Sequence, residues 1–165
     1  MPLEGTPMAK DTTGRLHVTV KSGGKRKLSS KLWLERQLND PYVMQAKRDG
    51  FRSRAAYKLR DIDDKQRFLK SGQVVVDLGA APGGWSQIAA KRVGSVEGRG
   101  KVVAIDLLEM PELPGVMFAQ MDFLDDRAPE KLRAMIGGGA DVVMSDMAAN
   151  TTGHRKTDQL RIIGL

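Results

Sequence analysis

Residues 74–85, with the sequence Val-Val-Val-Asp-Leu-Gly-Ala-Ala-Pro-Gly-Gly-Trp, constrain the fold of this chain more than any other segment. The segment begins with a short β-branched run, which is typical of a strand buried on both faces of a parallel sheet. Gly79, Gly83 and Gly84 follow, and glycine permits positive φ angles and a close approach of the backbone to a ligand. Gly83 and Gly84 also open a helix. This arrangement predicts a ligand site, because open parallel sheets bind ligands at the carboxyl ends of their strands.

The rest of the chain continues the alternation of strands and helices. Apolar runs predict strands over residues 101–105, 116–120 and 141–145, and helices over residues 84–92 and 128–136. Three earlier helices are predicted over residues 29–38, over residues 41–49 with Gly50 as the C-terminal cap, and over residues 51–68. Strands that alternate with helices in this way predict an α/β fold with a parallel sheet and right-handed crossovers.

Positive charge is concentrated in the N-terminal part of the chain. Residues 1–60 hold 14 Lys and Arg against 5 Asp and Glu, whereas the remaining residues hold 13 against 15. A basic segment joined to a nearly neutral body is typical of a polyanion-binding surface, although a solvated basic tail would give the same pattern. We divide the chain into a basic flexible arm (residues 1–28), a basic helical extension (residues 29–70) and a sheet-containing part (residues 71–165).

Composition excludes several classes of site. The chain has no cysteine, so it has neither disulfides nor a cysteine-ligated metal centre. No stretch approaches the roughly 20 apolar residues of a membrane-spanning helix. We therefore expect a cytoplasmic protein that uses no metal and makes no membrane contact.

The glycine turn and its flanking carboxylates indicate the kind of ligand. The spacing of Gly79, Gly83 and Gly84 differs from the G-x-G-x-x-G pattern of dinucleotide-binding proteins, which places a nicotinamide oxidoreductase last among the alternatives. Asp77 lies in the strand itself and suits a cationic ligand. Asp106 and Asp122 follow the next two strands, although each alone is more typical of a cap or turn residue. Together they would suit ribose hydroxyls, an adenine edge and a sulfonium or amino group, and S-adenosylmethionine carries all of these.

Three motifs in order then resemble a known family. They are residues 77–86 (Asp-Leu-Gly-Ala-Ala-Pro-Gly-Gly-Trp-Ser), residues 52–58 (Arg-Ser-Arg-Ala-Ala-Tyr-Lys) and residues 143–150 (Val-Met-Ser-Asp-Met-Ala-Ala-Asn). From about Ser29 onwards the chain resembles the FtsJ/RrmJ (RlmE-like) ribosomal RNA large-subunit methyltransferases.

The resemblance implies a fold, a cofactor and a reaction. The fold is the Rossmann-like fold of methyltransferases that use S-adenosyl-L-methionine, with residues 71–165 forming the N-terminal part of that domain. The reaction is methylation of a uridine ribose 2′-hydroxyl in large-subunit (23S) ribosomal RNA during ribosome biogenesis. The cofactor-binding residues that the resemblance implies are Gly83, Trp85, Asp106, Asp122 and Asp146, to which the glycine turn adds Asp77 and Gly79. Trp85 either stacks on the cofactor or packs its helix against the sheet.

The resemblance also implies a catalytic set of Lys, Asp, Lys and Glu. Lys58 matches the first lysine and Asp146 the aspartate, whose charge would orient a lysine and bias its pKa. The second lysine, which is the general base by resemblance, and the glutamate would lie beyond Leu165, as would the last strands of the sheet. We therefore expect a shortened form of the enzyme that binds the cofactor weakly and transfers little or no methyl.

The basic extension is the predicted RNA-binding surface. Lys47, Arg48, Arg52 and Arg54, with Phe51 and Tyr57 between them, suit a face that holds phosphates and stacks bases, although a solvated helix face would have the same composition. The expected partner is ribosomal RNA or the large ribosomal subunit, bound by a monomer. Two alternatives stay open: a transfer RNA or mRNA-cap 2′-O-methyltransferase, and a non-catalytic RNA-binding domain of Rossmann-like fold.

Overall fold

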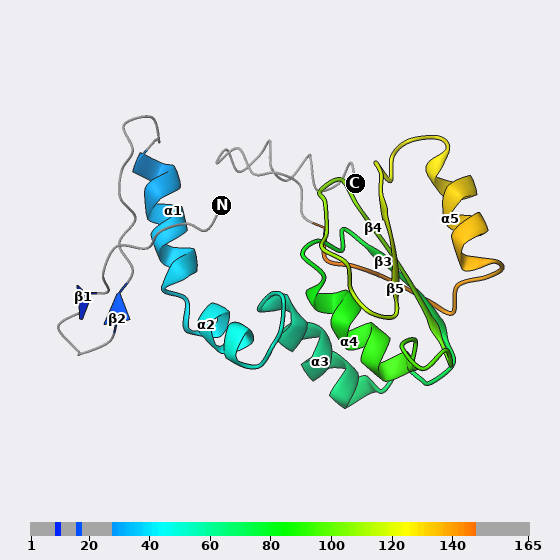
Figure 1. The fold of residues 1–165 in the computed structure, drawn as a ribbon, viewed down its shortest axis with the longest axis horizontal. Helices are drawn as coiled ribbons and strands as arrows, with labels where there is room; N and C mark the ends of the chain where they lie inside the picture. Colours follow the sequence, from blue (N-terminus) through cyan, green and yellow to red (C-terminus); the bar gives the residue numbers. More distant parts are fainter. Residues whose placement is uncertain (1–8, 11–15, 18–27, 148–165) are drawn as a thin grey trace.

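A computed structural model describes residues 9–10, 16–17 and 28–147 of the chain (Figure 1). Strands β1 (Ala9–Lys10) and β2 (Leu16–His17) pair as a short antiparallel ladder. The rest of the predicted flexible arm lies outside the described residues, so the arm remains a prediction. Residues 148–165, which include the end of the third family motif, also lie outside the described residues.

Three helices form the extension that precedes the sheet: α1 (Leu28–Leu38), α2 (Pro41–Arg48) and α3 (Ala55–Gln66). Asp40 caps α2, because its carboxylate accepts the N–H of Tyr42 at 2.8 Å and Pro41 needs no partner for a backbone N–H. Gly50 has a φ of 76°, which suits its predicted place just after this helix. The first two predicted helices are therefore confirmed to within a few residues.

The helix predicted over residues 51–68 is too long at both ends. Residues 51–54 are not helical, because the backbone N–H of Arg52 donates to the side chain of Gln87 at 2.7 Å. At the other end Arg67 takes a left-handed conformation, and its N–H donates to the Asp63 carbonyl. The Asp63 carboxylate accepts the N–H of Leu69 at 2.9 Å and so directs the chain towards the sheet.

Four parallel strands make the main sheet in the order β5-β4-β3-β6. They are β3 (Val74–Leu78), β4 (Lys101–Asp106), β5 (Val116–Gln120) and β6 (Val142–Ser145). At the start of β6, Asp141 donates its N–H to the Val74 carbonyl at 2.8 Å and accepts the Val74 N–H with its carboxylate at 2.7 Å. The predicted α/β fold with a parallel sheet is confirmed.

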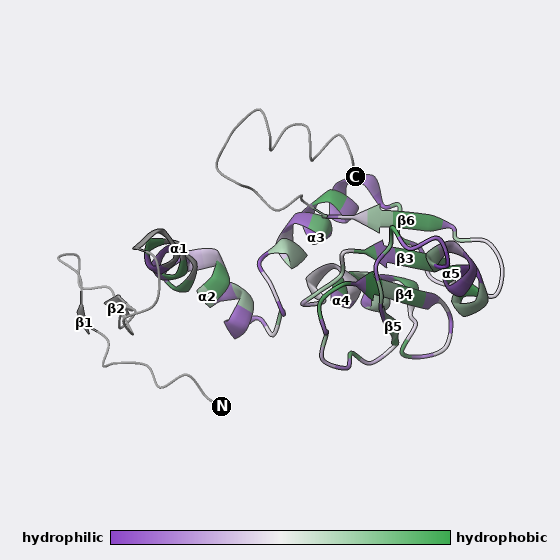
Figure 2. Cartoon of the chain, turned by 90° about the horizontal axis from the view of Figure 1, so that it is seen from above, coloured by the Kyte–Doolittle hydropathy of each residue, from purple (hydrophilic) through white to green (hydrophobic). Residues whose placement is uncertain are grey.

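Helices cover both faces of this sheet (Figure 1). Helices α3 and α4 (Gly84–Val93) pack on one face over buried residues that include Val75 and Val102. Helix α5 (Ala128–Ile136) packs on the other face over Val76 and Val103. Figure 2 shows the hydrophobic colour along the strands between these layers. Because alternate residues of a strand face opposite sides, Asp77 shares the α4 side with Val75.

The strand order arranges four carboxylates along one edge of the sheet. All four strands run in the same direction, so their carboxyl ends meet at one edge, where Asp122, Asp106, Asp77 and Asp146 follow in strand order. Within the described residues no group of three or more His, Cys, Asp or Glu has a geometry that would hold a metal ion. The helices in the described ranges are too short or too polar to cross a membrane.

Candidate active site

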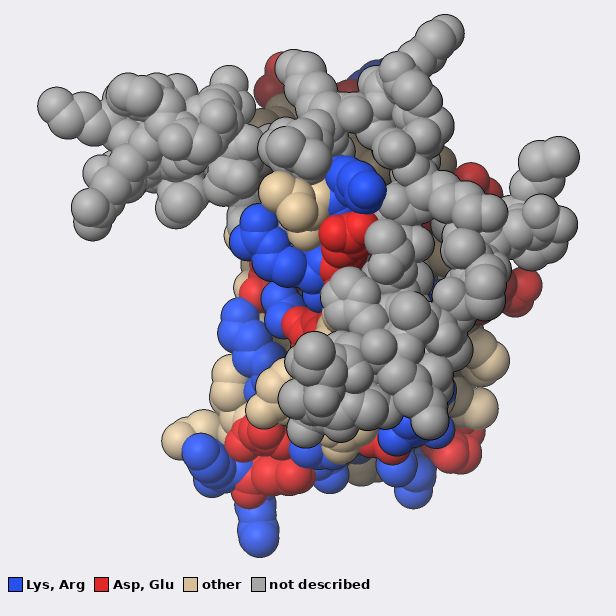
Figure 3. Space-filling model, turned by 90° about the vertical axis from the view of Figure 1, so that its left-hand side faces the viewer, with Lys and Arg blue, Asp and Glu red and all other residues tan. Residues whose placement is uncertain are grey.

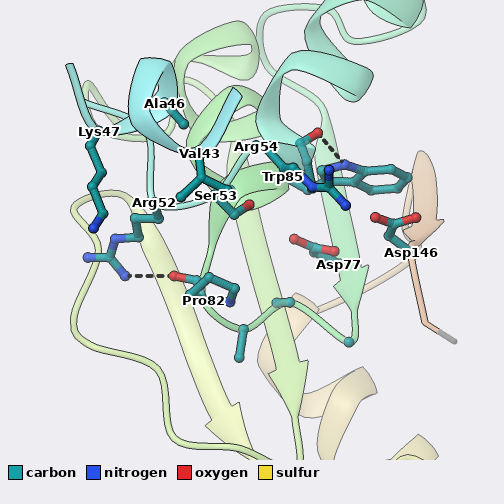
Figure 4. Close-up of a pocket in the computed structure, with 15 residues that line it drawn as sticks. Val43, Ala46, Lys47, Arg52, Ser53, Arg54, Asp77, Pro82, Trp85 and Asp146 are labelled. Atoms are coloured by element: carbon teal, nitrogen blue, oxygen red, sulfur yellow. Dashed lines mark hydrogen bonds between the residues drawn. The ribbon is translucent and has the colours of Figure 1, made fainter. Parts of the chain in front are cut away.

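A cleft of about 400 Å³ opens at the carboxyl edge of the sheet (Figure 4). Helix α2, the loop before α3, the glycine turn and the start of α4 form its walls. Apolar Val43 and Ala46 contribute one side, and the sequence-predicted residues that line the cleft are Lys47, Arg52, Arg54, Asp77, Gly79, Trp85 and Asp146. The fold thus brings most of the predicted site residues together, from segments up to about a hundred residues apart.

Asp77 is the buried charge of the cleft. Its exposed fraction is only 1%, and its carboxylate accepts a hydrogen bond from the Ser86 hydroxyl at 2.6 Å. The pKa of Asp77 is raised to about 6, chiefly by burial and in part by the nearby carboxylates of Asp106 and Asp146, whereas hydrogen bonds from Ser86 oppose the rise. A cation bound in the cleft would relieve the cost of ionising this carboxylate.

The glycine turn is held against β4 by backbone hydrogen bonds. The N–H groups of Gly79 and Ala80 both donate to the Ile105 carbonyl, at 2.8 and 3.1 Å, and the N–H of Ala81 donates to the Asp106 carboxylate at 2.8 Å. Gly79 has a φ of 75°, and the Met147 side chain occupies the space that a Cβ there would need. Glycine is therefore required at this position for both backbone conformation and space.

Asp106 and Asp122 do not line the cleft. Asp106 is half-buried behind the turn, and its second oxygen accepts the N–H of Leu108 at 2.8 Å. Asp122 is exposed and accepts the N–H of Leu124 at 2.9 Å, as a turn residue does. Gly83 is buried and is likewise not among the lining residues. Asp106 keeps free lone pairs for a ligand hydroxyl, whereas Asp122 lies two strands away from β3.

Lys58 and Asp146 form an ion pair at the edge of the cleft, although 88 positions separate them in the sequence. The Lys58 ammonium donates to the Asp146 carboxylate at 2.6 Å, and the two side chains are 58% and 38% exposed. The same ammonium lies 5.4 Å from the centre of the Trp85 ring, within the range of a cation–π contact. Figure 4 shows the carboxylates of Asp77 and Asp146 close to this ring.

Trp85 joins the two helices beneath this ion pair. Its ring is partly buried against the core between α3 and α4, and its indole N–H donates to the Ala55 carbonyl at 2.9 Å (Figure 4). Two roles were predicted for Trp85, namely stacking on the cofactor and packing its helix against the sheet. The structure shows the packing contacts. Trp85 is also one of the residues that line the cleft.

The predicted RNA-binding cations have different surroundings. Arg54 is paired with Asp40 at 2.5 Å, and the Arg52 guanidinium contacts backbone carbonyls. Lys47 and Arg48 are exposed side chains of α2. Figure 3 faces the side of the molecule with α1 and α2, and shows Lys and Arg gathered there with some Asp and Glu between them.

Of the two aromatic residues of this segment, Tyr57 is buried and Phe51 is partly buried. Tyr57 is buried, and its hydroxyl donates to the Asp49 carboxylate at 2.5 Å. Burial and this hydrogen bond raise the pKa of Tyr57 to about 12. Phe51 packs edge-on against the Tyr57 ring at 5.2 Å between centroids, so both rings serve the internal packing of the extension.

Comparison with known proteins identifies the family to which this chain belongs. A model of the FtsJ-like methyltransferases matches residues 51–165, which include the glycine turn, Lys58 and Asp146. The chain belongs to the FtsJ-like methyltransferase family. The ribosomal RNA large subunit methyltransferase E of Afipia carboxidovorans is 87% identical over 158 residues, and that of Rhodopseudomonas palustris is 82% identical. The alignments cover 96% of this chain and 70% and 67% of these relatives.

A solved structure supports the same assignment of fold. A ribosomal RNA methyltransferase from Plasmodium falciparum superposes with a TM-score of 0.60 at 32% sequence identity. The superposition covers 67% of this chain and 63% of that protein. This FtsJ-like chain therefore shares the fold of a solved ribosomal RNA methyltransferase over two thirds of its length.

The sequence analysis did not identify the residues that hold the cleft residues in place through hydrogen bonds. Ser86 donates the hydrogen bond to buried Asp77, and Gln87 binds the loop before α3. A serine next to Trp85 in the otherwise apolar start of α4 was an available signal for a buried polar partner. Gln87 gave no such signal, because its partners lie 35 or more positions earlier in the chain.

Proposed function

We propose that this chain binds S-adenosylmethionine in the cleft and belongs to an RNA ribose 2′-O-methyltransferase that modifies a uridine of large-subunit ribosomal RNA. The observation that carries the proposal is that Asp146, which is paired with Lys58, lines the same cleft as the buried carboxylate of Asp77 in an FtsJ-like methyltransferase. The large-subunit substrate is supported by relatives that are 80–87% identical. We propose that the protein acts as a monomer on the large ribosomal subunit, in the cytoplasm.

The residues of the cleft fit this cofactor. Its volume of about 400 Å³ falls within the roughly 300–1,000 Å³ of pockets that hold small ligands. Asp77 supplies a buried negative charge for a cationic group, and Asp106, which lies next to the cleft without lining it, has carboxylate oxygens that could accept from ribose hydroxyls. Gly79 and Gly84 both line the cleft, and their missing side chains make room for Met147 and Ser53. When bound, S-adenosylmethionine supplies an electrophilic methyl group.

The ion pair has an orienting role in the proposal. Asp146 holds the Lys58 ammonium at the mouth of the cleft, and this ammonium can donate a hydrogen bond to a ribose oxygen. In-line attack needs the reacting oxygen within about 3–3.5 Å of the methyl carbon, so a fixed donor at this point increases the fraction of productive encounters. Trp85 limits the movement of Lys58 from below. Lys47 and Arg48 hold RNA phosphates on the exposed face of α2.

Two measurements test the proposal on the protein expressed from the start to the stop codon of its reading frame. Titration calorimetry with S-adenosylmethionine should give saturable heat, whereas NAD should give none. A tritium transfer assay with large ribosomal subunits, free rRNA, transfer RNA and capped RNA should label the large-subunit RNA at a uridine 2′-oxygen. Labelling of transfer RNA or capped RNA instead would move the proposal to that substrate. The absence of cofactor heat would leave a non-catalytic RNA-binding domain.

A further inference from the structure

The Arg52 side chain joins three separate segments of backbone. Its guanidinium donates to the carbonyls of Pro111 and Glu112, both at 2.5 Å, and more weakly to that of Pro82 at 3.4 Å (Figure 4). Pro82 belongs to the glycine turn, whereas Pro111 and Glu112 belong to the loop between β4 and β5. Hydrogen bonds from a charged donor are stronger than those between neutral groups. One side chain therefore ties the extension to two loops of the sheet domain.

The backbone of Arg52 is anchored as well. Its N–H donates to the Gln87 side-chain oxygen at 2.7 Å, and the Gln87 amide nitrogen donates to the Gly50 carbonyl at 3.0 Å. Gln87 thus uses both ends of its amide to hold the loop before α3 against α4. This contact sets the point from which the arginine side chain reaches the two loops.

The space around the Arg52 side chain is closely filled. A Cβ added to Gly83 would lie 3.1 Å from the Arg52 Cδ and 3.0 Å from the Met110 sulfur. Met110 is itself buried, in a cluster with Ala80 and Ala104 beneath the turn. The half-buried arginine side chain therefore runs between the glycine turn and the β4–β5 loop, close to Gly83.

We propose that Arg52 is a positioning residue of the cofactor cleft, which fixes the glycine turn relative to the β4–β5 loop, and is not a contact for RNA phosphate. The inference rests on the proposed cofactor site. A planar guanidinium can serve several carbonyls at once, whereas the ammonium of a lysine is a compact charge without this fork. Lysine at position 52 would keep the positive charge and lose the geometry of the contacts.

The difference between charge and geometry supplies the test. Arg52→Lys, Arg52→Gln and the control Arg133→Lys, on the exposed surface of α5, are compared in calorimetry with S-adenosylmethionine in the absence of RNA. Arg52→Lys should weaken cofactor binding by roughly 10–100-fold, the range found when an outer-shell partner of a bound metal is removed. The control should bind as the wild type does. Amide hydrogen exchange of the ligand-free protein should accelerate at residues 83–84 and 109–113 in both Arg52 variants, and should be unchanged in the control.

An RNA contact would give the opposite pattern. If Arg52 held a phosphate, Arg52→Gln would lower the slope of log affinity against log salt for a large-subunit rRNA transcript by roughly 0.7–0.9, and would leave cofactor binding unchanged. That result, or wild-type cofactor affinity in Arg52→Lys, would overturn the inference. Circular dichroism and thermal melting establish that each variant is folded.

A second variant keeps the inference testable if the Arg52 variants fail to fold. Gln87→Met removes the amide that anchors the Arg52 N–H, and should weaken cofactor binding in the same direction. The two effects should be less than additive in the double variant, because both act through one set of contacts. Fully additive effects would contradict the inference. If the wild type binds no S-adenosylmethionine, the proposed function fails, and the hydrogen exchange of the ligand-free protein still decides whether Arg52 holds the two loops.

Discussion

Replacing Asp77 with asparagine should stabilise the folded protein and weaken its binding of a cationic cofactor. The carboxylate is almost fully buried, and its charged form has one described hydrogen-bond donor on a side chain, the Ser86 hydroxyl. Asparagine has nearly the same shape, and its carbonyl oxygen can accept the same hydrogen bond. The substitution therefore removes a buried charge and leaves packing largely intact.

The magnitude follows from the pKa of Asp77, which burial raises from 3.8 to about 6. A shift of about two units corresponds to roughly 3 kcal/mol, at 1.36 kcal/mol per unit. Because the folded-state pKa lies above the unfolded value, the folded protein binds more protons between about pH 4 and pH 6, and stability falls as the pH rises through this window. The full cost is present above pH 6. Asp77→Asn should recover up to about 3 kcal/mol there, and little near pH 4.

Urea unfolding at pH 4 and at pH 7.5 measures this gain. At pH 7.5 the gain corresponds to a rise of roughly 6–12 °C in melting temperature for a chain of this size. Asp125→Asn is the control, because hydrogen bonds from Arg127 lower the pKa of Asp125 and its loss should reduce stability at pH 7.5. If Asp77→Asn raised the free energy of unfolding equally at both pH values, the gain would come from packing. The argument from the buried charge would then be wrong. No gain at pH 7.5 would refute it as well.

Four further expectations concern binding, catalysis and packing. Calorimetric affinity for S-adenosylmethionine should fall as the pH drops from 7 to 5 in the wild type and stay level in Asp77→Asn; a level wild-type profile would count against a cation at Asp77. Lys58→Met should change the free energy of unfolding by less than about 1 kcal/mol, because the ion pair is exposed, and should slow methyl transfer by roughly 100-fold or more; near-normal turnover would exclude Lys58 from the site. Lys47→Ala and Arg48→Ala should each reduce the slope of log RNA affinity against log salt by roughly 0.7–0.9. Unchanged slopes would show that α2 does not contact RNA phosphates. Ile105→Ala should cost about 2–5 kcal/mol in urea unfolding, and a loss below about 1 kcal/mol would contradict the described core.

The sheet was predictable because its signal is local. Each strand is a short β-branched or apolar run, and burial between two helical layers leaves such runs few alternatives. The limits of the segment 51–68 depended instead on distant partners. The Gln87 side chain holds residues 50–52 in a loop, and the Asp63 carboxylate ends α3 by accepting the Leu69 N–H. Helical spacing carries no information about such contacts.

The candidate site was predictable to the extent that it depends on the edge of the sheet. Parallel strands bring their carboxyl ends together, so Asp77 and Asp146 meet at one cleft. The order of the strands decides which other carboxylates join them, and the sequence does not contain that order in a local pattern. Asp122 follows β5, on the outer side of β4, and therefore lies apart from the cleft.

Two carboxylates in one cleft have opposite surroundings, and this contrast argues for a functional role of the buried one. Asp146 is partly exposed and forms an ion pair with Lys58. Asp77 is buried, lacks a described cationic partner, and costs stability when ionised. Folding alone would favour an uncharged residue at position 77, and perturbed, costly ionisable groups concentrate where binding or catalysis requires them. The cost of ionising Asp77 is therefore consistent with the proposed binding of a cationic ligand in the cleft.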